Sequence, residues 1–260
     1  MKIVVCVKYV PDAASARSFE ADGTVDREAV SGLLSELDEY AVEQALRIKD
    51  EAPDTEVVAV CIGPAAAEDA VRRALQMGAD SGIHVQDAAI AGSDALATSL
   101  VLAKAVEKAG FDLILCGMAS TDGGIGVVPA MLSERLGIPG LMLAANLQVE
   151  GPLVRIRRDT DAATEVVEAT LPLIVAVTDQ TGEARYPSFK GIMAAKKKDV
   201  QTWSLADLGI DPAQVGLAAS WSAVDSTAAR PARQAGTVVI DADGAGAPAL
   251  VDFLVAGKFV

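Results

Sequence analysis

The stretch KIVVCV, residues 2–7, decides the fold class of this chain. After Lys2 it is a continuous apolar run rich in β-branched residues, which is typical of a strand buried on both faces of a parallel sheet. Runs of the same kind follow at residues 56–62, 82–85, 112–116 and 173–177. Glycine or a polar residue comes directly after each run, so each is short enough to be a strand.

Helical patterns fill the intervals between these runs. They cover residues 36–49, 65–77 and 94–108, and Ser93 is the expected N-cap of the last. Strands that alternate with helices require right-handed crossovers, which place helices on both faces of the sheet. We therefore predict an α/β fold with an open, mainly parallel, Rossmann-like sheet covered by helices on both faces.

Two further regions depart from this alternation. Residues 153–158 and 165–169 alternate apolar and charged side chains, which predicts an antiparallel hairpin inserted before the last strand. Beyond residue 200 the sequence is rich in Ala, Ser, Pro, Gly and Asp and is too poor in large apolar residues for a core of its own. We expect a nucleotide-binding domain at residues 1–199 and an extended C-terminal arm at 200–260.

The few large side chains of the arm are expected to need a separate surface for burial. They could instead pack back on the chain's own sheet, as termini often do. These side chains are Trp203, Leu205, Trp221, Phe253, Leu254 and Phe259.

Composition excludes several partners. The chain has 22 basic and 36 acidic residues, a net charge of −14, which repels nucleic acid and anionic membranes. Cys6, Cys61 and Cys116 lie in or beside apolar runs, as buried reduced thiols do. The N-terminus reaches Lys8 and Pro11 too early for a signal peptide or a spanning helix. We expect a cytoplasmic protein without direct membrane insertion.

Ligands of parallel sheets bind outside the carboxyl ends of the strands, where helix N-termini point amide donors at anions. The candidate ligand-binding segments are therefore residues 8–12, 63–64 and 117–126. The last contains Ser120, Thr121 and the glycines Gly123, Gly124 and Gly126, whose amides can approach a phosphate. Glycine-rich turns of this kind also occur where a helix packs on a strand and no nucleotide binds. This turn matches neither the GxGxxG dinucleotide motif nor the P-loop.

Residues for acid–base or metal chemistry are few. His84 lies within an apolar strand, where a hydrogen-bonded structural histidine is the expectation. No Cys-x-x-Cys pair, His cluster or Gly-x-Ser-x-Gly motif occurs in the sequence. The acidic cluster of Glu36, Asp38, Glu39 and Glu43 is explained by helix initiation. We expect no catalytic residue and no metal ligand.

Several blocks in order resemble the electron transfer flavoprotein beta subunit, from residue 1 to about 208. The segment at residues 182–198 is the most specific of them. The blocks are KIVVCVKYVPD (2–12), LDEYAVEQAL (37–46), VAVCIGP (58–64), ALQMGAD (74–80), GMASTDGG (117–124) and GEARYPSFKGIMAAKKK (182–198).

The resemblance implies a sheet of the adenine-nucleotide alpha-hydrolase type. It also implies a heterodimer with a larger alpha subunit, which carries most of an FAD. The beta subunit supplies one wall of the FAD site and binds a structural AMP. Many relatives carry consecutive acids and a Gln in the AMP loop, where this chain has Asp122, Gly123, Gly124 and Val127, so the expected contacts are those of the backbone. By motif, the AMP contacts fall at Cys6, Lys8, Ser35, Leu37, Asp38, Ile62, Asp122, Gly123, Gly124, Ile125, Gly126, Val127 and Val128.

The resemblance also implies a partner-recognition loop at residues 184–194. In the family this loop binds dehydrogenases through a bulky apolar anchor, and Phe189 occupies that place here. An exposed aromatic on a loop is typical of a binding hot spot, although Phe189 could instead cover its own core. The recognition residues are Tyr186, Pro187, Ser188, Phe189, Lys190, Gly191 and Ile192.

The function implied is electron carriage from acyl-CoA or other flavin dehydrogenases to a membrane quinone oxidoreductase, by a carrier subunit that is not an enzyme alone. The C-terminal arm is expected to dock on the alpha subunit. One alternative is a bifurcating flavoprotein that holds a second FAD in place of AMP. Another is a stand-alone nucleotide-binding module of the stress-protein type.

Overall fold

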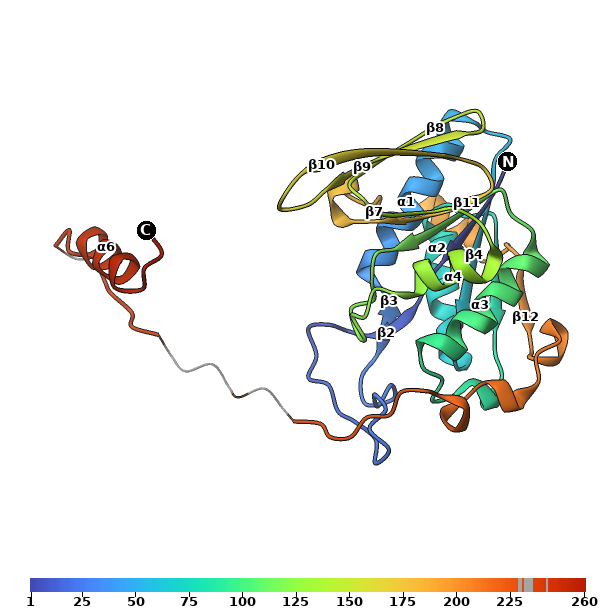
Figure 1. Ribbon diagram of the computed structural model, residues 1–260, viewed down its shortest axis with the longest axis horizontal. Coiled ribbons are helices and arrows are strands. Elements are labelled where there is room, and N and C mark those ends of the chain that lie inside the picture. Colours follow the sequence, from blue (N-terminus) through green and yellow to red (C-terminus); the bar gives the residue numbers. More distant parts are fainter. Residues whose placement is uncertain (229–230, 232–235, 242) are drawn as a thin grey trace. The chain divides into compact units, whose positions relative to one another are not determined.

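The computed structural model describes residues 1–228, 231, 236–241 and 243–260 (Figure 1). The chain divides into two compact units, Met1–Asp225 and Ser226–Val260. The first unit contains the predicted α/β core.

A seven-stranded sheet forms the centre of the first unit, and every pairing within it is parallel. This confirms the predicted α/β class and all five predicted parallel strands, whose ends lie within one residue of the expected ranges. Across the sheet the strands are β12 (Val200–Trp203), β5 (Ser81–Val85), β4 (Glu56–Ile62), β1 (Lys2–Cys6), β6 (Leu113–Gly117), β11 (Leu173–Val177) and β7 (Gly140–Ala144).

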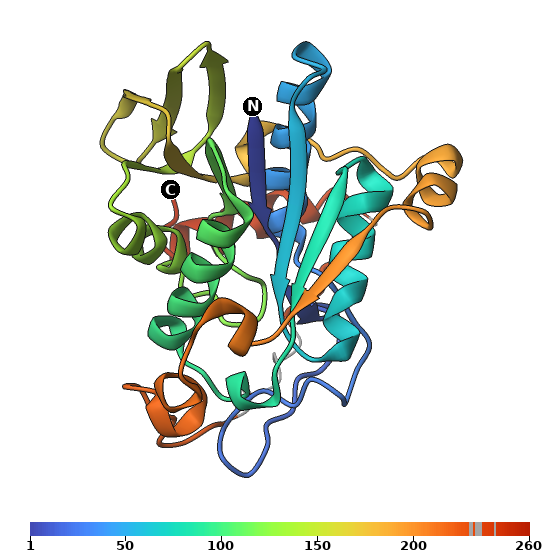
Figure 2. The ribbon, with the colours of Figure 1, turned by 90° about the vertical axis from the view of Figure 1, so that its right-hand side faces the viewer.

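Helices cover both faces of this sheet, as predicted (Figure 2). Helices α1 (Glu36–Glu51) and α2 (Glu68–Met77) pack on the face that carries Ile3 and Val5 of β1. Helices α3 (Ala95–Ala109) and α4 (Val128–Leu136) pack on the face that carries Val4. Successive side chains of a strand point to opposite faces, so one apolar run serves both cores.

The remaining helices are short or lie late in the chain. They are α5 (Phe189–Ala195), α6 (Gly246–Ala256) and the 3-10 helices Ala65–Ala67, Ala88–Ile90, Asp179–Thr181, Ala206–Leu208, Pro212–Gln214 and Leu217–Ala219. No helix in the described ranges combines the length and apolar character needed to span a membrane.

The N-cap of α3 is Asp94, so the expectation of Ser93 was wrong. The Asp94 carboxylate accepts a hydrogen bond from the Ala97 N–H at 3.0 Å. The Ser93 hydroxyl instead accepts from the Gly216 N–H at 2.7 Å. Both residue types favour caps, and a long-range contact decided between them.

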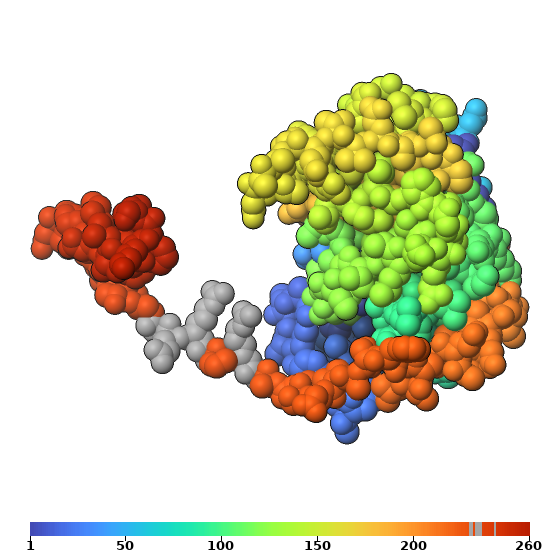
Figure 3. Space-filling view, viewed as in Figure 1, coloured from blue at the N-terminus to red at the C-terminus, as the bar shows by residue number. Residues whose placement is uncertain are grey.

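Two antiparallel sheets accompany the parallel one. The predicted hairpin is present as β9 (Leu153–Asp159) and β10 (Thr164–Thr170), and β8 (Asn146–Glu150) adds a third strand. The end of the hairpin projects from the surface of the first unit (Figure 3, yellow). Strands β2 (Tyr9–Pro11) and β3 (Gly32–Leu34) form the other pair and bracket residues 12–31.

The predicted domain boundary at residues 199/200 was wrong. Strand β12 pairs with β5, and Leu205, Leu208 and Ile210 are buried in the same core as the sheet. The Lys108 ammonium lies 4.5 Å from the centre of the Trp203 ring. The apolar residues of this segment are buried against the chain's own sheet. This was the alternative to burial on a separate surface. The first unit therefore extends to Asp225.

The second unit carries exposed apolar side chains. In α6, Leu250, Phe253 and Val255 are each more than half exposed. The rings of Phe253 and Phe259 lie with their centroids 6.0 Å apart. The expected extended arm thus contains a helix, and its docking on an alpha subunit stays a prediction.

Candidate functional site

Four of the predicted AMP contacts converge at the carboxyl end of β1. The Lys8 N–H donates to the Asp38 carboxylate at 2.8 Å, and the Lys8 carbonyl accepts from the Ser35 N–H at 2.9 Å. The Lys8 ammonium contacts the Asp122 carboxylate at 2.8 Å and the Ser120 hydroxyl at 3.3 Å. The start of α1 and the loop after β6 are therefore joined through a single lysine.

Two buried hydroxyl groups at this edge lack a partner. Ser35 is the N-cap of α1 and is fully buried, yet its hydroxyl makes no cap hydrogen bond. Within the described part of the chain, Ser35 Oγ and Thr121 Oγ1 are the two buried side-chain polar atoms without a hydrogen-bond partner. An unpaired buried hydroxyl costs about 1–3 kcal/mol, so such atoms mark places where a ligand can bond.

Asp38 is buried in the first turn of α1, where its N–H donates to the Ser35 carbonyl at 2.9 Å. Burial raises the pKa of its carboxyl to about 7, although the Lys8 N–H and ammonium act in the opposite direction. A Cβ on Gly117 would lie 2.5 Å from the Asp38 carboxylate and 2.7 Å from the Leu37 carbonyl oxygen. Only glycine at the end of β6 lets the strand approach the start of α1 this closely.

Asp122 lies between two basic side chains. Its side chain is 1% exposed, and Arg27 contacts it at 2.7 Å opposite Lys8. Although burial disfavours the charge, the Lys8 ammonium and the Arg27 guanidinium hold the pKa of Asp122 well below its ordinary value. The Gly123 N–H also donates to the Asp122 carboxylate, at 2.6 Å.

Arg17 and Arg27 also contact the loop after β6, and neither was predicted from the sequence. Both come from residues 12–31, and the Arg17 guanidinium donates to the carbonyls of Thr121 and Asp122. They lie 105 and 95 residues from Asp122 in sequence, so no local spacing connects them to it. No sequence pattern pointed to them, because the pairing of β2 with β3, which returns this segment to the end of β1, is apparent only in the folded chain.

The glycine loop after β6 is open to solvent. Gly123, Gly124, Ile125 and Gly126 are exposed, and Gly124 has a φ of 65°. The loop leads into α4, whose N-cap Val127 has no capping side chain and whose first residue is Val128. Exposed glycine amides before a helix can donate to an anion.

The other predicted AMP contacts form apolar surroundings. Cys6 and Ile62 lie at the ends of neighbouring strands β1 and β4, and Leu37 lies in the first turn of α1. All three cysteines are free and buried, as predicted, and burial raises the pKa of Cys61 to about 12. His84 is also structural, since it is 1% exposed and its Nε2 lies 3.1 Å from the Gly63 carbonyl oxygen.

The predicted recognition residues include two highly exposed aromatics. Tyr186 is 89% exposed and Phe189 is 81% exposed, so Phe189 does not cover its own core. Half of the predicted loop is helical, because Ser188 caps α5 by accepting from the Gly191 N–H at 3.0 Å. A Cβ on Gly191 would lie 2.5 Å from the Gln76 carbonyl oxygen, so this glycine allows α5 to approach α2.

Known proteins match the chain over nearly its whole length. A model of the electron transfer flavoprotein domain matches residues 22–208. The electron transfer flavoprotein subunit beta of Mycobacterium tuberculosis is 42% identical over 264 aligned positions, which cover 99% of both chains. The chain belongs to the electron transfer flavoprotein beta-subunit family. The family's subunit from Mycobacterium leprae is 43% identical over the same share of both chains.

A more distant relative of the same family is subunit CarD of the caffeyl-CoA reductase-Etf complex of Acetobacterium woodii. It is 34% identical and covers 92% of each chain. Membership in the electron transfer flavoprotein family confirms the resemblance and implies pairing with an alpha subunit.

Proposed function

We propose that this beta subunit binds AMP at the carboxyl ends of β1, β4 and β6 and supplies one wall of an FAD site that the alpha subunit mainly holds. In this proposal the heterodimer carries electrons from acyl-CoA or other flavin dehydrogenases toward a membrane quinone oxidoreductase. The observation that carries the AMP assignment is the pair of unpartnered buried hydroxyls, Ser35 Oγ and Thr121 Oγ1.

The charges at this edge suit a phosphate. Lys8, Arg17 and Arg27 bring three positive charges, whereas Asp122 is the one fully ionised carboxylate among the contacts described there. Asp38 has a pKa of about 7 and is therefore only partly charged at neutral pH. The positive charges of Lys8, Arg17 and Arg27 at the loop after β6 favour an anion there, in a chain of net charge −14. Amides of Gly123–Gly126 would hold the phosphate, and the hydroxyls of Ser35 and Thr121 would bond phosphate or ribose.

The buried thiols favour a carrier rather than a thiol enzyme. Burial raises the pKa of Cys61, and the hydrogen bond with Cys6 raises that of Cys116. A thiol with a raised pKa is a poor nucleophile. We propose that this subunit acts as a binding scaffold for the carrier.

Nucleotide extraction tests the AMP assignment. The chain is purified with its alpha subunit, and the bound small molecules are identified and counted by mass spectrometry. We expect one AMP and one FAD per heterodimer, and loss of AMP alone in a Ser35→Ala, Thr121→Val double variant. Two FAD and no AMP would establish the bifurcating alternative. ATP hydrolysis by the beta chain alone, without an alpha subunit, would establish the stand-alone module.

We also propose that Phe189 is the anchor for dehydrogenases. Burial of an exposed aromatic at a hot spot can contribute ~2 kcal/mol, so Phe189→Ala should weaken docking at least about tenfold. Flavin absorbance and melting temperature should stay unchanged, because the side chain is 81% exposed. Phe19→Ala is the matched control, since Phe19 is an exposed aromatic (48%) outside the recognition segment. An unchanged dehydrogenase affinity would reject the anchor.

The second unit is the part of the chain that we propose to dock on the alpha subunit. Its apolar side chains Phe253, Val255 and Phe259 are each more than half exposed within the described structure. Exposed apolar surface of this kind favours a protein interface. Deletion of residues 226–260 should weaken the heterodimer, as measured by gel filtration of the mixed subunits. An unchanged affinity would reject the arm as an interface.

A further inference from the structure

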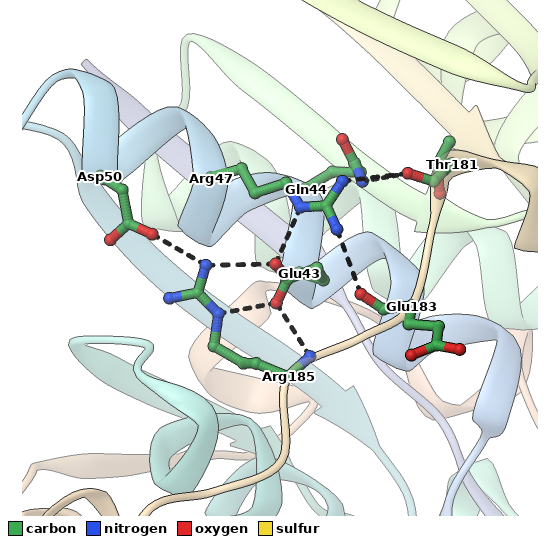
Figure 4. A network of polar contacts seen from close by, with 7 residues as sticks. All are labelled: Glu43, Gln44, Arg47, Asp50, Thr181, Glu183 and Arg185. Atoms are coloured by element: carbon green, nitrogen blue, oxygen red, sulfur yellow. Dashed lines mark hydrogen bonds and ion pairs between the residues drawn. The ribbon is translucent and has the colours of Figure 1, made fainter.

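A buried carboxylate on α1 holds the chain segment that leads to the exposed aromatics (Figure 4). Glu43 accepts hydrogen bonds from the Arg185 Nε at 2.7 Å and from the Arg185 Nη2 at 3.2 Å. It also accepts from the Arg185 backbone N–H at 3.1 Å. The carboxylate therefore fixes both the guanidinium and the main chain of Arg185.

Two more side chains of α1 hold the main chain just before Arg185. The Arg47 guanidinium donates to the Thr181 and Glu183 carbonyls, each at 3.1 Å, and to the Glu43 carboxylate at 2.9 Å. The Gln44 amide donates to the Thr181 carbonyl at 3.2 Å. Three neighbouring positions of one helix thus fix the backbone of residues 181–185.

Burial gives this contact its strength. The Glu43 side chain is 6% exposed, whereas Asp50, the other carboxylate on Arg185, is 62% exposed. Burial alone would raise the pKa of Glu43, but hydrogen bonds from Arg185 and Arg47 hold it below its ordinary value. A carboxylate that accepts two bonds from one guanidinium is fixed in direction as well as in distance.

The exposed aromatics follow directly. Tyr186 is the next residue after Arg185, and Phe189 begins α5 three residues later. The far end of α5 is also fixed, because Ala195 is buried and the Lys198 ammonium donates to the Leu75 and Gly78 carbonyls, each at 3.3 Å. The aromatics are therefore exposed on a short segment that is tied to the core at both ends.

We propose that Glu43 is a positioning residue for partner recognition, which sets through Arg185 the direction in which Tyr186 and Phe189 face a docking dehydrogenase. This inference rests on the proposed role of Phe189. A segment that is ordered before docking loses less conformational entropy when the partner binds. Helix α1 begins at the candidate nucleotide site, so one rigid element supports both surfaces.

Glu43→Gln tests the inference in the flavin-loaded heterodimer, with Asp50→Asn as the matched control on the same guanidinium. An acyl-CoA dehydrogenase serves as the electron donor. We expect Glu43→Gln to raise the KM for the flavoprotein about fivefold at unchanged kcat, equivalent to a loss of about 1 kcal/mol. Hydrogen exchange of residues 186–195 should become about tenfold faster. FAD and nucleotide content should stay unchanged, and Asp50→Asn should behave as wild type.

Phe189→Ala, measured in parallel, separates the two ways of failing. A raised KM in Phe189→Ala with an unchanged KM in Glu43→Gln overturns the positioning role and leaves the partner surface standing. Unchanged KM values in both variants overturn the partner surface and the inference with it. An equal rise in Asp50→Asn shows a general charge effect and also overturns the inference. If Glu43→Gln does not fold, Arg185→Lys replaces it, since lysine keeps the charge but cannot hold both carboxylate oxygens.

Discussion

Helix α1 carries two buried carboxyl groups that behave in opposite ways. Asp38, near its start, is 7% exposed, and Glu43, five residues later, is 4% exposed. Burial raises the pKa of Asp38 to about 7. Burial acts on Glu43 in the same direction, yet Arg185 and Arg47 hold its pKa below the ordinary value. The partners of a carboxyl group, more than its depth, decide its charge.

The surroundings of Asp38 and Glu43 also differ in how completely their polar groups are paired. Lys8 links Asp38 to the loop after β6, and Ser35 before α1 and Thr121 in that loop carry the buried side-chain polar atoms left without a partner in the described ranges. Around Glu43, two guanidinium groups and a backbone N–H already share the carboxylate. A region whose polar groups are all paired serves the architecture, whereas unpaired buried groups mark the place of a ligand.

The largest expected effect is on the Glu43 side of this comparison. Arg185→Ala removes two of the four hydrogen bonds that the buried Glu43 carboxylate accepts. The free energy of unfolding should therefore fall by about 3 kcal/mol at pH 7. Arg155→Ala is the control, because its ion pair with Glu168 is exposed on the hairpin and contributes about 1 kcal/mol or less. Urea denaturation measures both. Equal losses would contradict the importance of burial.

The next effect is on the pH dependence of stability, to which Asp38 and Glu43 contribute with opposite signs. Between pH 4 and 7 the unfolded chain has ionised Asp38 and the folded chain keeps its proton, so this group's contribution to stability falls as pH rises, by up to about 1.4 kcal/mol per pH unit. The contribution of Glu43 is complete above its ordinary pKa of 4.5 and is lost as pH falls through its lowered folded pKa.

Variants separate these two contributions. Between pH 5 and 7 the stability of nucleotide-free Asp38→Asn relative to wild type should rise by about 2 kcal/mol, because the variant lacks the titrating group. That of Glu43→Gln relative to wild type should stay nearly constant in this window. Denaturation curves at several pH values give both differences. Parallel curves for Asp38→Asn and wild type would show that Asp38 has an ordinary pKa.

A smaller effect is expected from removing the Ser35 hydroxyl, which has no hydrogen-bond partner, or the Ser188 hydroxyl, which caps α5. Ser35→Ala removes no hydrogen bond from the nucleotide-free chain, so its melting temperature should not fall, while AMP release should become about fivefold faster. Ser188→Ala removes the cap of α5 and should destabilise that helix by about 1 kcal/mol, seen as faster hydrogen exchange. A lower melting temperature in Ser35→Ala would show that its hydroxyl has a protein partner.

The smallest effect is expected at Asp50. Asp50→Asn removes a contact of 2.8 Å to the same guanidinium that Glu43 holds. Because this carboxylate is 62% exposed, the free energy of unfolding should change by no more than about 0.5 kcal/mol. A loss as large as that of Arg185→Ala would remove the distinction between buried and exposed partners.

The elements predicted correctly from the sequence are those with a local period. The apolar runs of β1 and β4 and the 3.6-residue pattern of α1 are visible in single windows. Strand β12 reads VQTW, which is too short and too polar for such a signal, and its pairing with β5 gives it its structure. For the same reason the sequence placed the domain boundary before β12 instead of after it.

The site was predictable to the extent that it depends on strand ends. Lys8, Asp38 and Asp122 follow or face such ends and were predicted. The contact between Arg27 and Asp122 spans 95 residues, and that between Arg185 and Glu43 spans 142. Charged pairs across such distances have no period, so only the folded chain shows which carboxylate each arginine contacts.

Strand β12 also prevents β5 from being an exposed edge strand that could pair with a second copy of the chain. It covers one edge of β5, and the Gly82 and Gln86 N–H groups donate to carbonyls of Asp199 and Trp203 at 3.0 and 2.9 Å. Without residues 200–203, the backbone groups of an apolar strand would be free to pair with another copy of the chain. A chain shortened at residue 200 should therefore aggregate whatever its affinity for a partner. A cut after Asp225 keeps β12 on the edge of β5, so it tests the second unit alone.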